Sequence, residues 1–286
     1  SIRRQRQMCI RDRAVVETGE NVIRETILPG AILTRVATSH IRIGTFQYVA
    51  MRGDIQTLKV LVDYSIDRHY PNLKGTSNPA LALLKTVKDK QIELITNWMR
   101  VGFIHGVMNT DNMAISGETI DYGPCAFMDT YNPETVFSSI DQQGRYAYSN
   151  QPPIVHWNLL RFAETLLPLI DDKKEKAIKI AEETINSFNV DYKKHWLDMM
   201  LKKLGLFGEE KDDETLVTTL LSLMHQKKAD YTNTFCSLAE QNIPKDKLFE
   251  DSTFLNWYQQ WQIRLTKNKK PFELSLRLMR SNNPLI

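Results

Sequence analysis

The polar residues between positions 102 and 123 are those whose types and spacing could do chemistry. Within this stretch, Ser116-Gly117 has the composition of a two-residue hairpin turn. With that turn, Asn112 falls directly opposite Asp121, and cross-strand partners share a face with Cβ atoms about 5 Å apart. Two oxygen ligands at that separation suit a hard cation, and Mg²⁺ is commonly held by one or two protein oxygens plus water and substrate phosphates. The spacing therefore favours a metal–nucleotide site.

A polar hairpin that binds nothing would use the same residue types, because Asn, Asp, Ser and Gly are common turn formers. The wider pattern strengthens the metal interpretation. His105 with Asn112, followed by Asp-Tyr-Gly at 121–123, parallels the kinase motifs H-R-D-x-x-x-x-N and D-F-G, whose Asn and Asp hold the metal ions. One element differs: Val107 occupies the position of the kinase catalytic aspartate and cannot accept a proton. The motifs indicate a kinase-like lobe without the usual base.

Several runs of sequence closely resemble the signature of the selenoprotein O family, also called YdiU. They are residues 105–113 (His-Gly-Val-Met-Asn-Thr-Asp-Asn-Met), 119–124 (Thr-Ile-Asp-Tyr-Gly-Pro), 35–44 (Arg-Val-Ala-Thr-Ser-His-Ile-Arg-Ile-Gly), 144–146 with 150–152, and 157–159. The resemblance implies a protein-kinase-like fold that binds ATP in a flipped orientation. It also implies transfer of AMP, not of the γ-phosphate, to Ser, Thr or Tyr hydroxyls of proteins; some bacterial relatives are described as using UTP.

Carried over by position, the resemblance implies a role for five residues. Asp111 is implied to be the proton acceptor, and Asn112 and Asp121 the ligands of Mg²⁺ or Mn²⁺, with Asp121 also against the nucleotide. Arg35 and Arg42 are implied to grip the phosphates of ATP. The chemistry is coherent, because a hydroxyl that attacks the α-phosphorus needs a carboxylate within hydrogen-bond reach. A metal ion and guanidinium groups would offset charge on the phosphates and on the leaving pyrophosphate.

Other conspicuous side chains near these motifs are expected to be structural. We expect His105 to hold the loop in place and not to transfer protons. Tyr146 and Trp157 are interpreted as packing aromatics and not as a stacking platform. For Arg145, contact with substrate and structural pairing are both open.

The composition is that of an ordinary globular protein, with 286 residues, 42% hydrophobic and 25% charged. Its apolar runs are far shorter than the roughly 18 residues that span a membrane. Three widely separated cysteines indicate neither a disulfide framework nor a zinc site. We expect no membrane partner, and a cytoplasmic location in a bacterium or a mitochondrial one if the source is eukaryotic.

Composition and periodicity divide the chain into three parts. Residues 1–13 hold five arginines and one aspartate, and are interpreted as a non-native or disordered segment. Because this segment accounts for the net charge of +3, we expect no basic face and no nucleic-acid partner. Residues 14–48 are predicted to be N-lobe strands and hinge, with a hairpin turning at 19–21 and a further strand at 31–37. Residues 49–286 are predicted to be a kinase-like C-lobe, truncated at its C-terminus.

Caps and apolar spacing predict the helices of the third part. Asp54 is the expected N-cap of a helix that ends before Pro71, and Asn78-Pro79 opens a helix that ends before Gly102. Further helices are expected at 157–170, 172–188, 192–204, 214–225 and 252–265. The predicted fold class is α+β, mostly α: a few N-terminal strands, a catalytic-loop β-hairpin and a large helical C-lobe.

The resemblance also implies parts that this sequence lacks. The family carries a glycine-rich segment, an ATP-contacting Lys and its Glu partner before the matching motifs, and a redox-active Cys or selenocysteine near its end. We therefore expect half of a nucleotide cleft, weakly active or inactive alone. Apolar surface where the missing lobe would pack should make the chain prone to aggregate.

Two other functions compete with the adenylyltransferase hypothesis. A small-molecule kinase of the aminoglycoside or choline type also uses a His-Gly-Asp loop, but Val107 stands where those enzymes keep the aspartate. A non-catalytic pseudokinase that acts as an interaction scaffold would not need the set of Asp111, Asn112 and Asp121.

Overall fold

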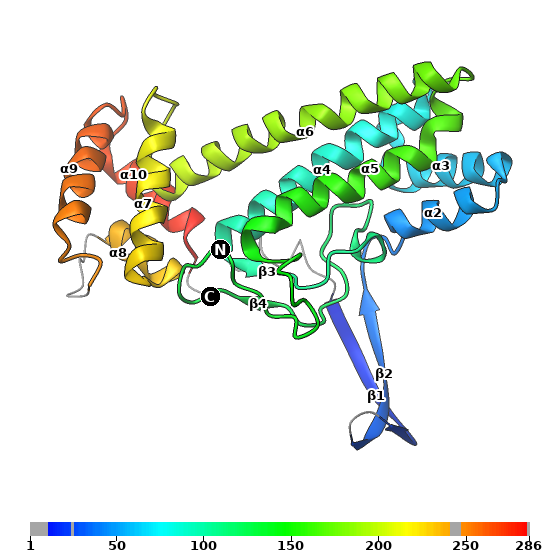
Figure 1. The fold of residues 1–286 in the computed structure, drawn as a ribbon, viewed down its shortest axis with the longest axis horizontal. Coiled ribbons are helices and arrows are strands. Elements are labelled where there is room, and N and C mark those ends of the chain that lie inside the picture. Colours follow the sequence, from blue (N-terminus) through cyan, green and yellow to red (C-terminus); the bar gives the residue numbers. More distant parts are fainter. Residues whose placement is uncertain (1–10, 24–25, 241–246, 285–286) are drawn as a thin grey trace.

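The computed structural model describes residues 11–23, 26–240 and 247–284, which form a largely helical protein (Figure 1). The helices are α2 (Ile43–Met51), α3 (Ile55–His69), α4 (Pro79–Val101), α5 (Gln151–Ile170), α6 (Lys174–Lys203), α7 (Asp213–Lys227), α8 (Tyr231–Glu240), α9 (Ser252–Thr266) and α10 (Phe272–Asn282). The strands are β1 (Arg11–Ile23), β2 (Ile27–Val36), β3 (Phe103–Ile104) and β4 (Ala126–Phe127), and the 3₁₀ turns are η1 (Pro71–Leu73), η2 (Thr110–Asn112) and η3 (Tyr148–Asn150). The predicted class, α+β and mostly α, is confirmed.

Strands β1 and β2 form one antiparallel hairpin that projects away from the helices (Figure 1). The prediction of a turn at 19–21 followed by a separate strand is wrong, because the pairing continues to Ile23 opposite Ile27. Residues 19–21 instead form a register irregularity within the hairpin, with Gly19 in the left-handed region at φ +76°. A bulge absorbs turn-forming residues in this way without reversing the chain.

The N-terminal boundary of the fold lies earlier than predicted. Strand β1 begins at Arg11, inside the segment 1–13 that was set apart from the fold, and Arg11 pairs with Val36. Residues 1–10 lie outside the described residues, so their interpretation as non-native or disordered stays a prediction.

Local capping signals set the starts of α3 and α4 as predicted. The Asp54 side chain accepts a hydrogen bond from the Thr57 amide at 2.9 Å, and the Asn78 side chain accepts one from the Leu81 amide at 3.0 Å. Helix α4 ends at Gly102, whose φ of 71° is the left-handed conformation that suits glycine. The 23-residue α4 thereby delivers the chain directly to the polar segment that follows it.

Helices α4, α5 and α6 lie side by side and build the main core (Figure 1). The prediction of two helices at 172–188 and 192–204 is wrong, since α6 continues through all 30 residues. At the expected break, Asp191 pairs with Lys88 of α4 at 2.5 Å and accepts a hydrogen bond from Ser187 at 2.9 Å. The apolar pattern lapses there because a polar contact to α4 replaces an apolar one, and the backbone stays helical.

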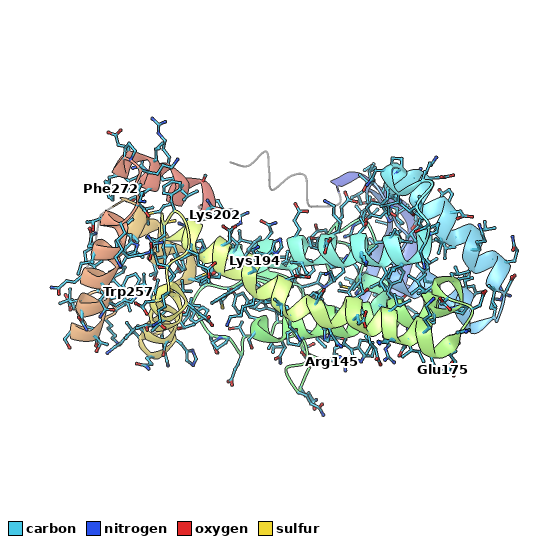
Figure 2. All side chains as sticks on the ribbon, turned by 90° about the horizontal axis from the view of Figure 1, so that it is seen from above. Arg145, Glu175, Lys194, Lys202, Trp257 and Phe272 are labelled. Carbon is cyan, nitrogen blue, oxygen red and sulfur yellow. The ribbon has the colours of Figure 1, made fainter. Side chains whose placement is uncertain are left out.

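Helices α7 to α10 pack at one end of the molecule, where Trp257 lies far from Glu175 at the other end (Figures 1 and 2). Trp257 and Trp261 are buried, and Arg264 and Asp213 form a buried two-pronged ion pair with N–O distances of 2.7 and 3.0 Å. No helix in the described part of the chain is long and apolar enough to cross a membrane. The helices from α2 to α10, with the polar segment after α4, fit the kinase-like fold with a large helical lobe that the resemblance implied. The assignment of residues 49–286 to that lobe stays a prediction.

Candidate active site

The side chain of His105 stabilises the loop that begins at this residue. The His105 side chain is fully buried, and its Nε2 lies 2.7 Å from the carbonyl oxygen of Ile120. Its ring stacks on Trp98 with centroids 5.4 Å apart. Burial lowers the pKa of His105, and hydrogen bonds with backbone groups and the charge of Asp121 oppose that effect only in part. A neutral imidazole that donates to Ile120 therefore joins the two motif segments, as the sequence predicted for His105.

Two amide side chains of α5 form hydrogen bonds with the backbone of the same loop. The Gln151 Oε1 accepts a hydrogen bond from the His105 amide at 3.0 Å, and its Nε2 donates to the Phe103 carbonyl at 2.9 Å. The Asn158 Nδ2 donates to the Met108 carbonyl at 2.8 Å. Both amides are completely buried. Sequence reasoning missed these roles; the available signal was an uncharged amide at an otherwise apolar position of a helix.

The chain after η2 pairs with the segment that enters α2. The Ile43 amide donates to the Met113 carbonyl at 3.0 Å, and the Ile115 amide donates to the Ile41 carbonyl at 3.0 Å. From the other side, Gln91 of α4 donates to the Ala114 carbonyl at 2.7 Å. Residues 113–115 are therefore fixed between α4 and the start of α2.

This pairing corrects the predicted register of the catalytic-loop hairpin. Met113 pairs with Thr119 in an isolated bridge, and the Gly117 amide donates to the Ala114 carbonyl at 3.1 Å. The β-turn therefore has residues 115–116 and not 116–117 at its centre, and Thr119 lies opposite Met113, where the predicted register places Ile120. Asn112 is consequently not the direct partner of Asp121, contrary to the geometry first inferred from the spacing.

Tertiary contacts explain the shift. Trp98 of α4 donates to the Thr119 hydroxyl at 3.0 Å, which holds the returning strand. Gly117, at φ +73°, packs so closely on α4 that a Cβ would lie 3.1 Å from the Lys90 carbonyl oxygen. Contacts with α4 and with the residues just before α2 fix the position of the turn. These contacts outweigh the turn preference of Ser116-Gly117.

Asp111 and Asn112 lie next to each other on η2 but face different environments. Asn112 is buried, and its Nδ2 donates to the Val107 carbonyl at 2.9 Å. Its Oδ1 is thereby the atom left to ligate a cation. Asp111 is exposed, and its amide donates to the Asn109 side chain at 3.0 Å. The turn thus presents a fixed amide oxygen beside an accessible carboxylate.

Asp121 has an unusual backbone conformation. Its φ is +58°, in the left-handed region where few residues other than glycine lie, and its carbonyl accepts a hydrogen bond from the Gly123 amide at 2.8 Å. The adjoining loop is tightly packed, since a Cβ on Gly106 would lie 2.9 Å from Cγ of Pro124. Such strained backbone persists only where its surroundings impose it, and it is frequent at functional sites.

The two arginines of the predicted site lie on different elements of the fold. Arg42 precedes α2 and donates from Nη1 to the Asp111 carbonyl at 3.2 Å, so the structure brings these two residues together. Arg35 lies near the end of β2, on the projecting hairpin. Between them, the Thr38 amide donates to the Glu118 carboxylate at 3.1 Å, and the Thr38 hydroxyl donates to the same oxygen. Glu118 therefore ties the hairpin exit to the catalytic-loop turn.

By the chemistry of their side chains, Asn112 and Asp121 would suit a divalent cation of the Mg²⁺ type. An amide oxygen of Asn112 and the carboxylate of Asp121 are both hard oxygen ligands, of the kind that such ions prefer. Within residues 11–284 as described, no group of three or more His, Cys, Asp or Glu residues could hold a metal ion. A cation here would take its remaining ligands from water and phosphates, as Mg²⁺ commonly does.

Arg145, left open by the sequence, has a defined aromatic partner. Its Cζ lies 5.0 Å from the ring centre of Trp157 and 5.8 Å from that of Tyr146, and Arg161 lies 5.4 Å from Trp157. Arg145 stands on a loop that projects from the helices (Figure 2). Trp157 is 41% exposed, so it packs against two guanidinium groups at the surface and not in the core.

Comparison with known proteins identifies the family of this chain. A sequence model described as protein adenylyltransferase SelO matches residues 6–286, and the chain belongs to this family. The match includes residues 6–13, which lie within the arginine-rich segment 1–13.

The chain is also similar to curated bacterial proteins named protein nucleotidyltransferase YdiU. The one from Alcanivorax borkumensis is 56% identical over 276 residues, which cover 96% of this chain and 57% of the relative. The one from Nitrosococcus oceani is 57% identical over 276 residues, or 96% of this chain and 56% of the relative. The one from Pelagibacter ubique is 54% identical, with 96% and 57% covered. The chain thus spans just over half the length of these relatives.

Proposed function

We propose that this chain carries the catalytic loop of a protein nucleotidyltransferase that moves AMP from ATP to Ser, Thr or Tyr hydroxyls of other proteins with the help of Mg²⁺ or Mn²⁺. One observation carries the proposal: η2 presents the accessible carboxylate of Asp111 beside the buried amide of Asn112, with Arg42 bonded to the same turn. The names of the family and of the relatives support nucleotidyl transfer.

Asp111 would act as the proton acceptor. The hydroxyl oxygen of the protein substrate forms a bond to the α-phosphorus, and the bridging P–O bond on the far side breaks. Pyrophosphate leaves with that electron pair, and the hydroxyl proton passes to the Asp111 carboxylate. An exposed carboxylate on a fixed turn can approach an incoming hydroxyl, which is the geometric requirement for a general base.

Arg42 and the metal ligands would stabilise the phosphates. A guanidinium has five N–H donors, and Arg42 uses one of them in its bond to the Asp111 carbonyl. Its other donors would grip phosphate oxygens. Asn112 and Asp121 would hold the cation, which when bound offsets negative charge on the phosphates and the leaving group. Arg35 would complete the grip from the hairpin.

The competing functions have less support. A small-molecule kinase would need a carboxylate at position 107, where the chain has Val107, and the Val107 carbonyl is engaged by Asn112. A pure scaffold would not require a strained Asp121 joined through His105 to the same loop.

The deciding experiment follows label from ATP into protein. A full-length chimaera, with this segment in place of the matching one of a curated relative, is incubated with Mg²⁺ or Mn²⁺ and ATP labelled at the α- or the γ-phosphate. We expect α-label in protein, lost in Asp121→Ala and reduced at least a hundredfold in Asp111→Asn, since general-base catalysis contributes roughly 10²–10⁴. Incorporation of γ-label alone would return the protein to the kinases, and ATP binding without any transfer would favour the scaffold.

A further inference from the structure

The first turn of α2 touches the carboxylate of Asp111. Gly44 is the second residue of α2, and a Cβ on it would lie 2.0 Å from Oδ1 and 2.9 Å from Cγ of Asp111. Real Cβ atoms essentially never approach another heavy atom so closely. The observed direction of the Asp111 side chain therefore requires a residue without a side chain at position 44.

The backbone conformation does not explain this glycine. Gly102, Gly106 and Gly117 have φ values of 71°, 85° and 73°, which other residues rarely adopt. Gly44 is not among the glycines with positive φ, and it lies in the first turn of a helix, where its backbone conformation does not require glycine. Glycine is therefore needed at position 44 because the Asp111 carboxylate occupies the place of a Cβ atom.

Hydrogen bonds tie the two backbone segments to each other. The α2 entry segment (residues 42–44) is tied to the turn by the bond from Arg42 to the Asp111 carbonyl at 3.2 Å and by the bond from the Ile43 amide to the Met113 carbonyl at 3.0 Å. The one part of this contact that can yield is the end of the exposed Asp111 side chain. A methyl group at position 44 would rotate the carboxylate away and leave the fold intact.

We propose that Gly44 is a positioning residue, which aims the Asp111 carboxylate at the substrate hydroxyl by leaving open the space beside the first turn of α2. The inference rests on the proposed function for the role of Asp111. The contact between the two residues stands independently of it.

The test is Gly44→Ala in the full-length chimaera. We expect kcat for α-label transfer to fall at least tenfold, with the affinity for ATP unchanged. The melting temperature should stay the same or rise, because alanine is the better helix former. The control is Met51→Ala at the end of the same helix, where the side chain is 87% exposed and transfer should be unaffected.

Two further measurements separate positioning from a general structural effect. In an Asp111→Ala background, Gly44→Ala should cause no additional loss of kcat, because residues that act as a unit are non-additive. A crystal structure of Gly44→Ala should show the Asp111 carboxylate displaced. Full kcat in Gly44→Ala, equal losses in both backgrounds, or an unmoved carboxylate would each overturn the proposal.

The same variants distinguish failure of the proposed function from failure of the positioning proposal. If Asp111→Ala transfers α-label at the unchanged rate, the role of Asp111 as base is wrong, and positioning by Gly44 falls with it. If Asp111→Ala is inactive and Gly44→Ala is fully active, only the positioning proposal fails.

Discussion

The catalytic-loop segment (residues 103–123) and the β1–β2 hairpin (residues 11–36) show opposite relations to the rest of the protein. In the catalytic-loop segment, backbone groups are bonded by buried side chains of α4 and α5, and His105 joins its two ends. The hairpin strands contact mainly each other, and Val15, Val16 and Ile32 are between 60% and 65% exposed. One region is fixed by the core, and the other stands outside it.

The contrast divides the proposed site into two halves. Asp111, Asn112, Asp121 and Arg42 stand on or beside the fixed segment, where preorganised groups stabilise a transition state most effectively. Arg35 stands on the hairpin. The hairpin also exposes apolar side chains, and apolar patches of this kind mark interaction surfaces. That a missing lobe packs on such a surface stays a prediction. In the proposed site, the residues assigned to the chemistry thus lie on or beside the fixed segment, and the proposed phosphate grip depends in part on a region that the core does not hold.

The largest expected effect tests how firmly α5 fixes the loop. Gln151→Ala would leave the His105 amide and the Phe103 carbonyl without their buried partner. We expect the free energy of unfolding to fall by about 2–4 kcal/mol, since each unsatisfied buried group costs about 1–3 kcal/mol. Urea unfolding of this chain measures it. The control Gln142→Ala, at an exposed position, should unfold as the parent does; an equal loss there would show that the loop is not specially held.

The second-largest effect is expected at low pH, where the free energy of unfolding should fall. Burial lowers the pKa of His105 below its ordinary 6.5, and burial also lowers that of His69. Above pH 6.5 both the folded and unfolded forms are neutral, and stability is independent of these groups. Below pH 6.5 the unfolded chain binds protons that the folded chain refuses, so stability falls as pH falls.

The measurement is the unfolding free energy between pH 8 and pH 5, compared with His105→Gln. We expect the variant to have a shallower decline below pH 6.5, since His105, the more deeply buried of these two histidines, is gone. His40→Gln, at an exposed position, serves as the control. A decline of equal steepness in parent and His105→Gln would show that the loop histidine does not couple protonation to folding.

A smaller effect is expected where the two regions meet. Glu118→Ala removes the acceptor of the Thr38 amide and of the Ser116 hydroxyl, whose bonds to the carboxylate are both 3.1 Å long. We expect about 0.5–1.5 kcal/mol of lost stability. ATP affinity in the full-length chimaera should fall a few-fold. The reason is that Glu118 would no longer hold the end of the hairpin, which carries Arg35, against the catalytic-loop turn. Calorimetric titration with ATP checks this, and Glu134→Ala on the exposed surface should change neither quantity.

The smallest effect on stability is expected in the hairpin. Val16 and Ile32 are cross-strand partners, and both are largely exposed. Replacing both with threonine keeps β-branched side chains, so the strands should persist. We expect the unfolding free energy of the chain to change by less than about 0.5 kcal/mol. Sedimentation velocity should show less self-association, because apolar surface is removed. A loss of more than about 1 kcal/mol would mean that the hairpin packs on the core.

Local signals in the sequence determined the parts of this protein that depend on neighbouring residues. Asp54 and Asn78 cap the helices that they were predicted to cap, because a cap bonds an amide only three residues away. The motif runs identified the family, and with it the candidate residues, without any knowledge of the fold. The role of His105 in holding the loop was also predicted correctly.

Only the tertiary structure decided features whose partners are distant in sequence. The register around Met113 and Thr119 is set by Trp98 and by the α2 entry segment, so the turn preference of Ser116-Gly117 did not predict it. The role of Gln151 depends on a loop 46 residues earlier, and the space beside Gly44 is occupied by a carboxylate from η2. Composition and periodicity describe a residue and its near neighbours. Hydrogen bonds and close contacts between remote segments appear only when the chain has folded.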